Sequence, residues 1–204
     1  MAFPAIKKDK YSYADYLTWD DGIRREIIDG VVYEMKFEDE DQNAVYDMSP
    51  APNRRHQEIS GNLFLIISTY LKGKKCKVYS APFDVRLSRL TNENEITNVV
   101  QPDISVFCDH VKLDDKGAKG NPDWIIEILS KYSVKNDLGR KMVLYQSYGV
   151  KEYWVIDPKD EKVMVYILNE SGNYSLPKEY SNDGILTSVI FSDLGISLQE
   201  VFAE

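Results

Sequence analysis

The feature that most constrains this chain is a glutamate inside an apolar run. Residues 124–129 read Trp-Ile-Ile-Glu-Ile-Leu, and a short, nearly continuous apolar run is typical of a strand covered on both faces of a sheet. An ionised carboxylate in such a strand is costly unless it is paired or bound to a cation. We therefore expect Glu127 to be paired or bound to a cation, and we expect the chain to use it.

Two further charged residues stand on the elements next to this strand. Asp103 directly follows Pro102 at a strand pattern near Val99–Phe107. A helical pattern over Ser133–Tyr148 carries Lys141 on the same stripe as its apolar residues, which are Leu138, Tyr145 and Tyr148. The three residues Asp103, Glu127 and Lys141 are therefore predicted to lie on adjacent elements.

Each of these residues also has a purely structural explanation. Glu127 could form an ion pair with a lysine or arginine, Pro-Asp is a common turn dipeptide, and Lys141 could extend its amine to solvent. Taken singly, these explanations are at least as good as a functional one. Taken together they require three unrelated coincidences on neighbouring elements, so we favour a functional site.

The chemistry that these residue types serve is phosphodiester hydrolysis. Mg²⁺ binds through a few carboxylates while keeping several waters, and it can both activate a water and neutralise charge on a phosphate. Asp103 and Glu127 would be the ligands, and the Lys141 ammonium would orient the attacking water or steady the developing charge. Glu58, on an earlier helix, would be an additional ligand or an exposed helix glutamate.

Charge and composition limit the classes of protein. The 204 residues carry a net charge of −8, which argues against a general nucleic-acid coat protein but allows an enzyme with a local basic groove. No apolar run is long enough for a membrane span, and no secretory signal is visible. The two cysteines, Cys76 and Cys108, have no metal-ligand spacing and are expected to be isolated thiols of a cytoplasmic protein.

The chain reads as one domain over residues 1–204, with a core at about 53–157. A helix from Ser12 to about Trp19 and a hairpin around Asp29-Gly30 occupy 11–35, and an exposed acidic excursion covers 36–48. The further predicted elements are a helix at Arg54–Leu71 with Ile59, Leu63, Ile66 and Tyr70 on its inner face; strands at Lys77–Ser80, Phe83–Leu87, near Val99–Phe107 and at Trp124–Leu129; the helix Ser133–Tyr148; strands at Glu152–Ile156 and Lys162–Leu168; and a strand and short helix within Ile185–Phe202.

This order predicts an α/β fold with a mixed central sheet flanked by helices. The core follows an αβββαβ order, with a helix and hairpin added at the N-terminus and a hairpin added at the C-terminus.

At these residues the chain resembles a known family. The motifs that carry the resemblance, in order, are Tyr11-Ser-Tyr-Ala-Asp-Tyr-Leu, Glu26-Ile-Ile-Asp-Gly, Ser49-Pro-Ala-Pro, His56-Gln-Glu-Ile-Ser-Gly-Asn-Leu, Ala81-Pro-Phe-Asp-Val-Arg-Leu, Gln101-Pro-Asp-Ile-Ser-Val, Glu127-Ile-Leu-Ser and Gly149-Val-Lys-Glu-Tyr-Trp-Val-Ile-Asp-Pro. They are similar to the Uma-two family of restriction-endonuclease-like proteins, within the PD-(D/E)XK nuclease superfamily. Each motif is weak alone, but the ordered set covers nearly the whole chain.

The resemblance implies a restriction-endonuclease-like core, a divalent ion (Mg²⁺ or Mn²⁺) and nucleic acid, with DNA favoured, as the partner. Asp103 and Glu127 match the two acidic positions. The superfamily's lysine usually stands two residues after the second acid, where this chain has Leu129, so the resemblance implies that the lysine has moved to Lys141 or that activity is lost. His56, Asp84 and Asp137 are supporting candidates, with His56 expected to brace its helix near the site.

Two other interpretations stay open. The chain could be a catalytically inactive nuclease-fold protein that binds a partner or nucleic acid, or an interaction module whose buried charges form an ion-pair network. The ion-pair interpretation predicts a direct contact between Glu127 and Lys141 and no metal binding. A homodimer would supply the two sites that cutting both strands of a duplex requires.

Overall fold

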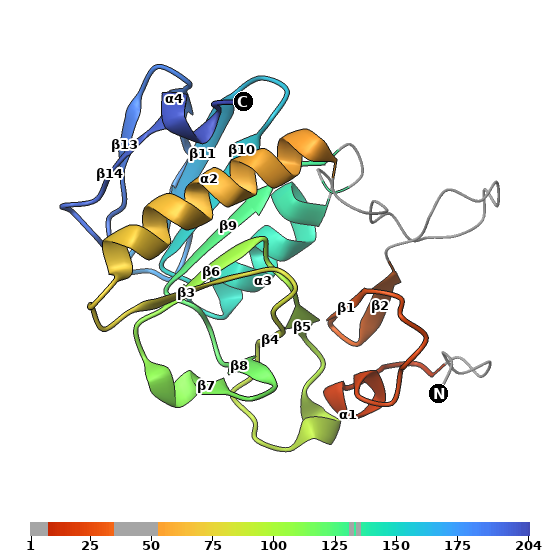
Figure 1. Cartoon of the computed structure of the whole chain (residues 1–204). Coiled ribbons are helices and arrows are strands. Elements are labelled where there is room, and N and C mark those ends of the chain that lie inside the picture. The colour runs from red at the N-terminus through yellow and green to blue at the C-terminus, as the bar shows by residue number, and fades with distance from the viewer. Residues whose placement is uncertain (1–7, 35–52, 131–132, 134–135) are drawn as a thin grey trace.

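The computed structural model describes residues 8–34, 53–130, 133 and 136–204 (Figure 1). Its α-helices are α1 (Tyr13–Tyr16), α2 (Arg54–Leu71), α3 (Met142–Ser147) and α4 (Leu198–Val201). Single helical turns lie at η1 (Glu93–Glu95), η2 (His110–Lys112) and, in π-helical form, η3 (Asn136–Lys141). The acidic excursion at 36–48 falls outside the described residues. None of the helices in the described ranges is long and apolar enough to cross a bilayer.

The central sheet has the strand order β12-β11-β10-β9-β6-β3. Its strands are β3 (Lys77–Ser80), β6 (Ile104–Phe107), β9 (Trp124–Ile128), β10 (Glu152–Asp157), β11 (Lys162–Ile167) and β12 (Lys178–Ser181). Strands β9 and β10 are parallel, and the other pairs are antiparallel. With α2 before β3 and α3 before β10, this mixed sheet has the αβββαβ order that the sequence predicts.

A second sheet has the order β2-β1-β5-β4-β8-β7. Its strands are β1 (Arg25–Ile28), β2 (Val31–Glu34), β4 (Val85–Arg86), β5 (Val99–Val100), β7 (Leu113–Asp114) and β8 (Gly117–Lys119). The predicted Asp29-Gly30 turn is confirmed, with positive φ at both residues, as a type I′ hairpin requires. A Cβ on Gly30 would lie 2.8 Å from the Lys10 Cβ, so this position also needs glycine for space.

The strand predicted near Val99–Phe107 is wrong as a single element. It divides at residues 101–103 into β5, which pairs with β1 and β4 in the second sheet, and β6, which pairs with β3 and β9 in the central sheet. Pro102 stands at the division and has no N–H to give to a ladder. The break places Asp103 just before the start of β6 and joins the two sheets next to it.

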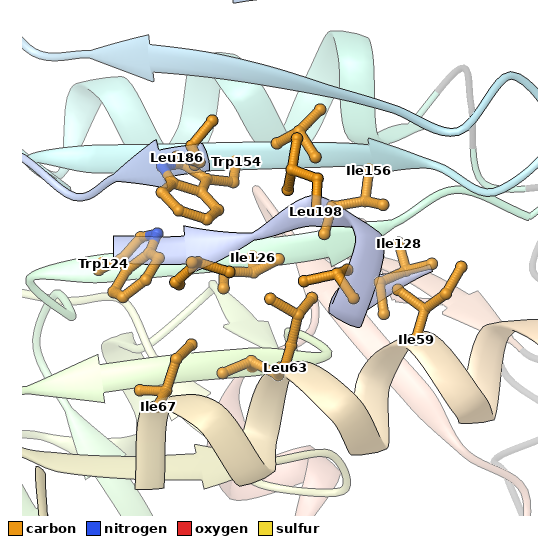
Figure 2. Close-up of a cluster of buried hydrophobic side chains, with 14 of the residues drawn as sticks. Ile59, Leu63, Ile67, Trp124, Ile126, Ile128, Trp154, Ile156, Leu186 and Leu198 are labelled. Carbon is orange, nitrogen blue, oxygen red and sulfur yellow. The ribbon is translucent and has the colours of Figure 1, made fainter. Parts of the chain in front are cut away.

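The core on one face of the central sheet is built by α2. Ile59, Leu63 and Ile67 from this helix pack against β9 and β10 (Figure 2). Residues Trp124, Ile126 and Ile128 point to this face, whereas Ile125 and Leu129 pack on the opposite face with α3. Because side chains alternate along a strand, Glu127 must point to the α3 face.

Several local predictions differ from the structure. The inner face of α2 continues through Ile67 and Leu71, while Ile66 and Tyr70 are only half-buried. The predicted strand at Phe83–Leu87 shortens to β4, where Arg86 is as buried as Val85 because it stretches to an ion pair with Asp114. At the C-terminus, β13 (Ile185–Thr187) and β14 (Gly195–Ser197) form a small sheet that leads into α4.

The prediction of two isolated cysteines is also wrong. Cys76 and Cys108 form a disulfide. The antiparallel register of β3 and β6 pairs Lys77 with Phe107, so the residues just outside that pair face each other. Spacing along the sequence could not show this, because the pairing depends on which strands are neighbours.

Candidate active site

The two predicted acids are neighbours across β6 and β9. The register pairs Ile104 with Ile126, so Asp103 and Glu127 stand at the next position along the two strands. The Asp103 N–H donates to Glu127 Oε2 at 3.4 Å, and the Ile128 N–H donates to Asp103 Oδ2 at 2.8 Å. Sheet pairing thus fixes the two carboxylates beside each other.

Glu127 is buried on the α3 face, where two side-chain donors hold it in addition to the Asp103 N–H. The Tyr145 hydroxyl donates to Glu127 Oε1 at 2.6 Å, and Lys141 Nζ donates to the same oxygen at 3.1 Å. Leu129, at the usual place of the superfamily's lysine, instead packs in the apolar cluster under α3. Lys141 contacts Glu127 from η3 and not from the strand.

Lys141 is the centre of an unbalanced charge cluster. Its Nζ lies 3.1 Å from Glu26 Oε2, 3.1 Å from Glu127 Oε1 and 3.5 Å from Asp137 Oδ1. These four side chains are almost completely excluded from solvent, with Lys141 4% exposed and Glu127 3% exposed. Three carboxylates thus surround one ammonium in a place where unbalanced charge is expensive.

The protonation of the cluster reflects this imbalance. Burial raises the pKa of Glu127 and of Asp137 above the usual carboxyl range, and the attraction of Lys141 opposes that rise only in part. Burial alone would lower the pKa of Lys141, but Glu127, Glu26 and Asp137 raise it well above its ordinary value. The lysine therefore stays charged, while burial favours the protonated forms of Glu127 and Asp137.

Glu26 is a site residue that the sequence reasoning missed. It lies in β1, whose four residues are all buried, and its Oε1 accepts a hydrogen bond from the Gln101 N–H at 2.7 Å. The signal that marked Glu127, a glutamate in a buried strand, was also present here. What the sequence could not show was the pairing of Ile27 with Val99, which carries β1 to the site.

His56 contacts Asp103 from the first turn of α2. Its Nε2 lies 3.1 Å from Asp103 Oδ2, and its buried Nδ1 has no hydrogen-bond partner among the described residues. Burial lowers the pKa of His56, but the hydrogen bond and charge of Asp103 outweigh burial and raise it overall. The contact joins the first turn of α2 to Asp103, and the role of His56 as a brace stays a prediction.

The other three candidates differ in whether they contact the cluster. Asp137 contacts Lys141 directly. Asp84 Oδ1 accepts from the Gln101 Nε2 at 2.7 Å, so it reaches the site only through Gln101. Glu58 pairs with Arg54 at 2.6 Å, and within the described residues no contact joins it to Asp103 or Glu127.

Several buried polar atoms of the described residues lack a hydrogen bond. His56 Nδ1 and Glu58 Oε2 are two of them. Glu26 Oε2 and Asp137 Oδ1 also lack one, but they lie 3.1 Å and 3.5 Å from Lys141 Nζ. Such atoms are rare in folded proteins and usually indicate a missing water or ion. Together with the excess of carboxylates, they fit a bound cation.

The arrangement fits a hydrated ion better than an enclosed one. In the described part of the chain, no three His, Cys, Asp or Glu side chains form a ready-made metal cage. Mg²⁺ often binds through only one or two carboxylates and keeps several of its waters. The adjacent Asp103 and Glu127 carboxylates meet that requirement.

Among the described residues, a second buried glutamate in the central sheet has only neutral hydrogen-bond donors around it, in contrast to Glu127. Glu152, in β10, accepts hydrogen bonds from neutral donors: the Trp154 indole at 2.8 Å, the Ser188 hydroxyl at 2.7 Å and the Val189 N–H at 3.1 Å. Both of its oxygens are satisfied, and it anchors the segment after β13. Burial of a carboxylate therefore does not by itself make a site; three carboxylates around one shared lysine distinguish the Glu127 cluster.

Comparisons with known proteins concern the whole chain and not this cluster. The model of the Uma2 family, described as "Putative restriction endonuclease", matches residues 13–199. An uncharacterized protein of Synechocystis sp. is 22% identical over 183 residues, which covers 88% of this chain and 86% of that protein. The crystal structure of a "putative nuclease belonging to DUF820" from Anabaena variabilis superimposes with a TM-score of 0.70 at 19% identity, covering 95% of this chain and 98% of that one.

Proposed function

The chain belongs to the Uma2 family, and from this membership we propose that it is a nuclease that hydrolyses phosphodiester bonds of DNA with a divalent metal ion, Mg²⁺ or Mn²⁺. The observation that carries the proposal is the cluster around Lys141, in which Glu26, Glu127 and Asp137 meet one ammonium. A purely structural network would be expected to balance its charges. An excess of buried carboxylate is what a cation site needs.

Asp103 and Glu127 would hold the ion. When bound, it would neutralise charge on the phosphate and lower the pKa of a coordinated water. The protein fixes both ligands in advance: His56 and the Ile128 N–H hold Asp103, and Tyr145 holds Glu127. Glu58, whose Oε2 is buried without a partner, would supply a further oxygen from α2.

Lys141 would act on the reacting groups through its ammonium. Its contacts with Glu26 and Asp137 keep it protonated and hold it beside Glu127. From there it can orient the attacking water or donate to a phosphate oxygen as charge develops. Asp84 supports the arrangement from outside by orienting Gln101.

An inactive nuclease-fold protein is the second candidate. The 3.1 Å contact between Lys141 and Glu127 is the contact that a structural ion-pair network predicts. That network leaves two carboxylates unmatched, however, which is why we favour the metal site.

Calorimetric titration with Mn²⁺ and Mg²⁺ tests the proposal, on wild type, Glu127→Gln and Glu152→Gln, with thermal melts of each. We expect wild type and Glu152→Gln to bind metal and Glu127→Gln to lose binding. Glu127→Gln should stay folded, because Glu26 and Asp137 still pair with Lys141, whereas Glu152→Gln should melt earlier. Absence of metal binding in wild type, with an early melt of Glu127→Gln, would favour the ion-pair network.

Cleavage should then be measured on supercoiled plasmid, single-stranded DNA and RNA, with Asp103→Asn as the inactive control. DNA cleavage that requires metal and disappears in Asp103→Asn supports the proposal. Linear plasmid formed without accumulation of nicked circles would indicate two sites acting together, as in a homodimer. Metal binding without cleavage of any of these substrates would favour the inactive candidate.

A further inference from the structure

Arg24 lies beside the acidic cluster and has no role in the function proposed so far. It immediately precedes β1, two residues before Glu26. In extended chain, residues two apart share a face, and the contacts agree: Arg24 and Glu26 both bind Gln101. Gln101 in turn stands two residues before Asp103. The guanidinium is thus held next to the loop that carries the first acid.

Gln101 accepts two hydrogen bonds from this guanidinium. Arg24 Nε donates to Gln101 Oε1, and Arg24 Nη2 donates to the Gln101 carbonyl at 3.1 Å. The amide of Gln101 is itself fixed, because its Nε2 donates to Asp84 Oδ1 at 2.7 Å and to the Tyr16 hydroxyl at 3.1 Å. Arg24 is therefore oriented by a buried side-chain amide that is itself fixed by two hydrogen bonds.

The acceptors of Arg24 are all neutral. No carboxylate of the described residues forms an ion pair with it, although the chain has 33 acidic residues. Other arginines of the structure do have carboxylate partners: Arg25 with Asp21 and Glu34, Arg54 with Glu58, Arg55 with Glu161, and Arg86 with Asp114. Arg24 thus combines a fixed orientation with an uncompensated charge.

A phosphate approaching this site needs such a charge. Lys141 is already surrounded by three carboxylates, and the acidic cluster repels an anion. A guanidinium presents several donors in a planar fork that matches phosphate oxygens. Arg24 is only half-buried, so it is accessible to a ligand from solvent.

We propose that Arg24 is a phosphate-binding residue of this site, and that Gln101 is its positioning residue. The guanidinium binds the nonbridging oxygens of a phosphodiester in the nucleic-acid backbone and so aligns the strand with Asp103 and Glu127. This inference rests on the proposed function, since it assigns the anion contact of the same site.

The test is binding of a fluorescein-labelled DNA duplex by fluorescence anisotropy, over a series of salt concentrations and with Ca²⁺ in place of Mg²⁺ to prevent cleavage. The variants are Arg24→Gln, Arg89→Gln and Gln101→Met. Arg89 is an exposed arginine beyond β4, so Arg89→Gln removes the same charge elsewhere. A calorimetric Mn²⁺ titration of each variant checks that the acidic cluster is intact.

We expect Arg24→Gln to bind DNA about tenfold more weakly, since one charge-assisted contact is lost. The slope of log affinity against log salt should fall by about 0.9, the value for one phosphate contact. Gln101→Met should weaken binding but keep the slope, because the charge remains and only its orientation is lost. Arg89→Gln should change neither quantity.

Three results would overturn the inference. Unchanged DNA affinity and slope in Arg24→Gln would remove Arg24 from the site while leaving the proposed function in place. Equal losses in Arg24→Gln and Arg89→Gln would indicate general electrostatics and not a positioned contact. Wild type that binds Mn²⁺ but no DNA would overturn both the inference and the DNA substrate.

Discussion

The Lys141 ammonium lies 3.1 Å from Glu26 Oε2. This contact joins η3, which covers the central sheet, to β1 of the second sheet. The candidate site therefore belongs to neither sheet alone, and the division of the chain at residues 101–103 is what brings the two sheets together. Substitutions in the candidate site should therefore change the stability of the fold, the binding of metal, or both.

Lys141→Met should destabilise the protein without metal, because it leaves three buried carboxylates without their counter-charge. The expected loss is about 3–5 kcal/mol at pH 8, and it should shrink at pH 5.5, where Glu127 and Asp137, whose pKa values burial raises, can take up protons. Urea unfolding at both pH values measures this. Lys178→Met, at an exposed lysine of β12, is the control; a loss of the same size at both pH values would contradict the explanation.

The stability of the metal-free protein should fall as pH rises from 5 to 8. Burial raises the pKa of Asp137 to about 6 and that of Glu127 to about 8, so between the ordinary and the raised values the folded state holds protons that the unfolded state has lost. Such groups stabilise the fold at the acidic end of the window, and the contribution disappears as pH passes the raised values. The raised pKa of His56 acts in the same direction.

Added Mg²⁺ should reverse this trend, because it competes with protons for the same carboxylates. The stabilisation that saturating Mg²⁺ gives in urea unfolding should therefore grow from pH 5 to pH 8. An increment independent of pH would mean that Mg²⁺ binds away from this cluster.

Tyr145→Phe should weaken metal binding mostly at low pH. The hydroxyl donates to Glu127 Oε1 at 2.6 Å and so favours the ionised carboxylate; without it, the pKa of Glu127 should rise further. We expect the pH midpoint of Mn²⁺ binding to move upward, with a stability loss of about 1 kcal/mol. Tyr166→Phe, at a buried tyrosine of β11, should leave the midpoint in place.

Replacing both cysteines by serine should lower stability without affecting metal binding. The disulfide closes a loop between residues separated by 32 positions, for which the chain-entropy model gives about 3–4 kcal/mol. Cys108 lies just past the end of β6, whereas Asp103 lies just before its start, so the acidic cluster should be undisturbed. Urea unfolding and Mn²⁺ titration of the double variant measure the two effects; reduced metal affinity would contradict this separation.

The sequence by itself determined the parts of this protein that depend on local pattern. Apolar periodicity gave α2 with its observed bounds and the buried strand β9, and Asp29-Gly30 gave the hairpin because only certain residues accept positive φ. The same pattern identified Glu127 and Lys141 as charges on buried faces, and the structure brings them into contact. The functional roles of these residues stay predictions.

Tertiary structure alone decided which of these parts meet. Periodicity tells which face of a strand is buried, but not which strand lies beside it. The pairing of β1 with β5 placed Glu26 against Lys141 and Arg24 against Gln101, and the pairing of β3 with β6 joined Cys76 to Cys108. Charges and thiols act on whatever lies within a few ångströms, and those neighbours come from strand pairing between distant parts of the chain.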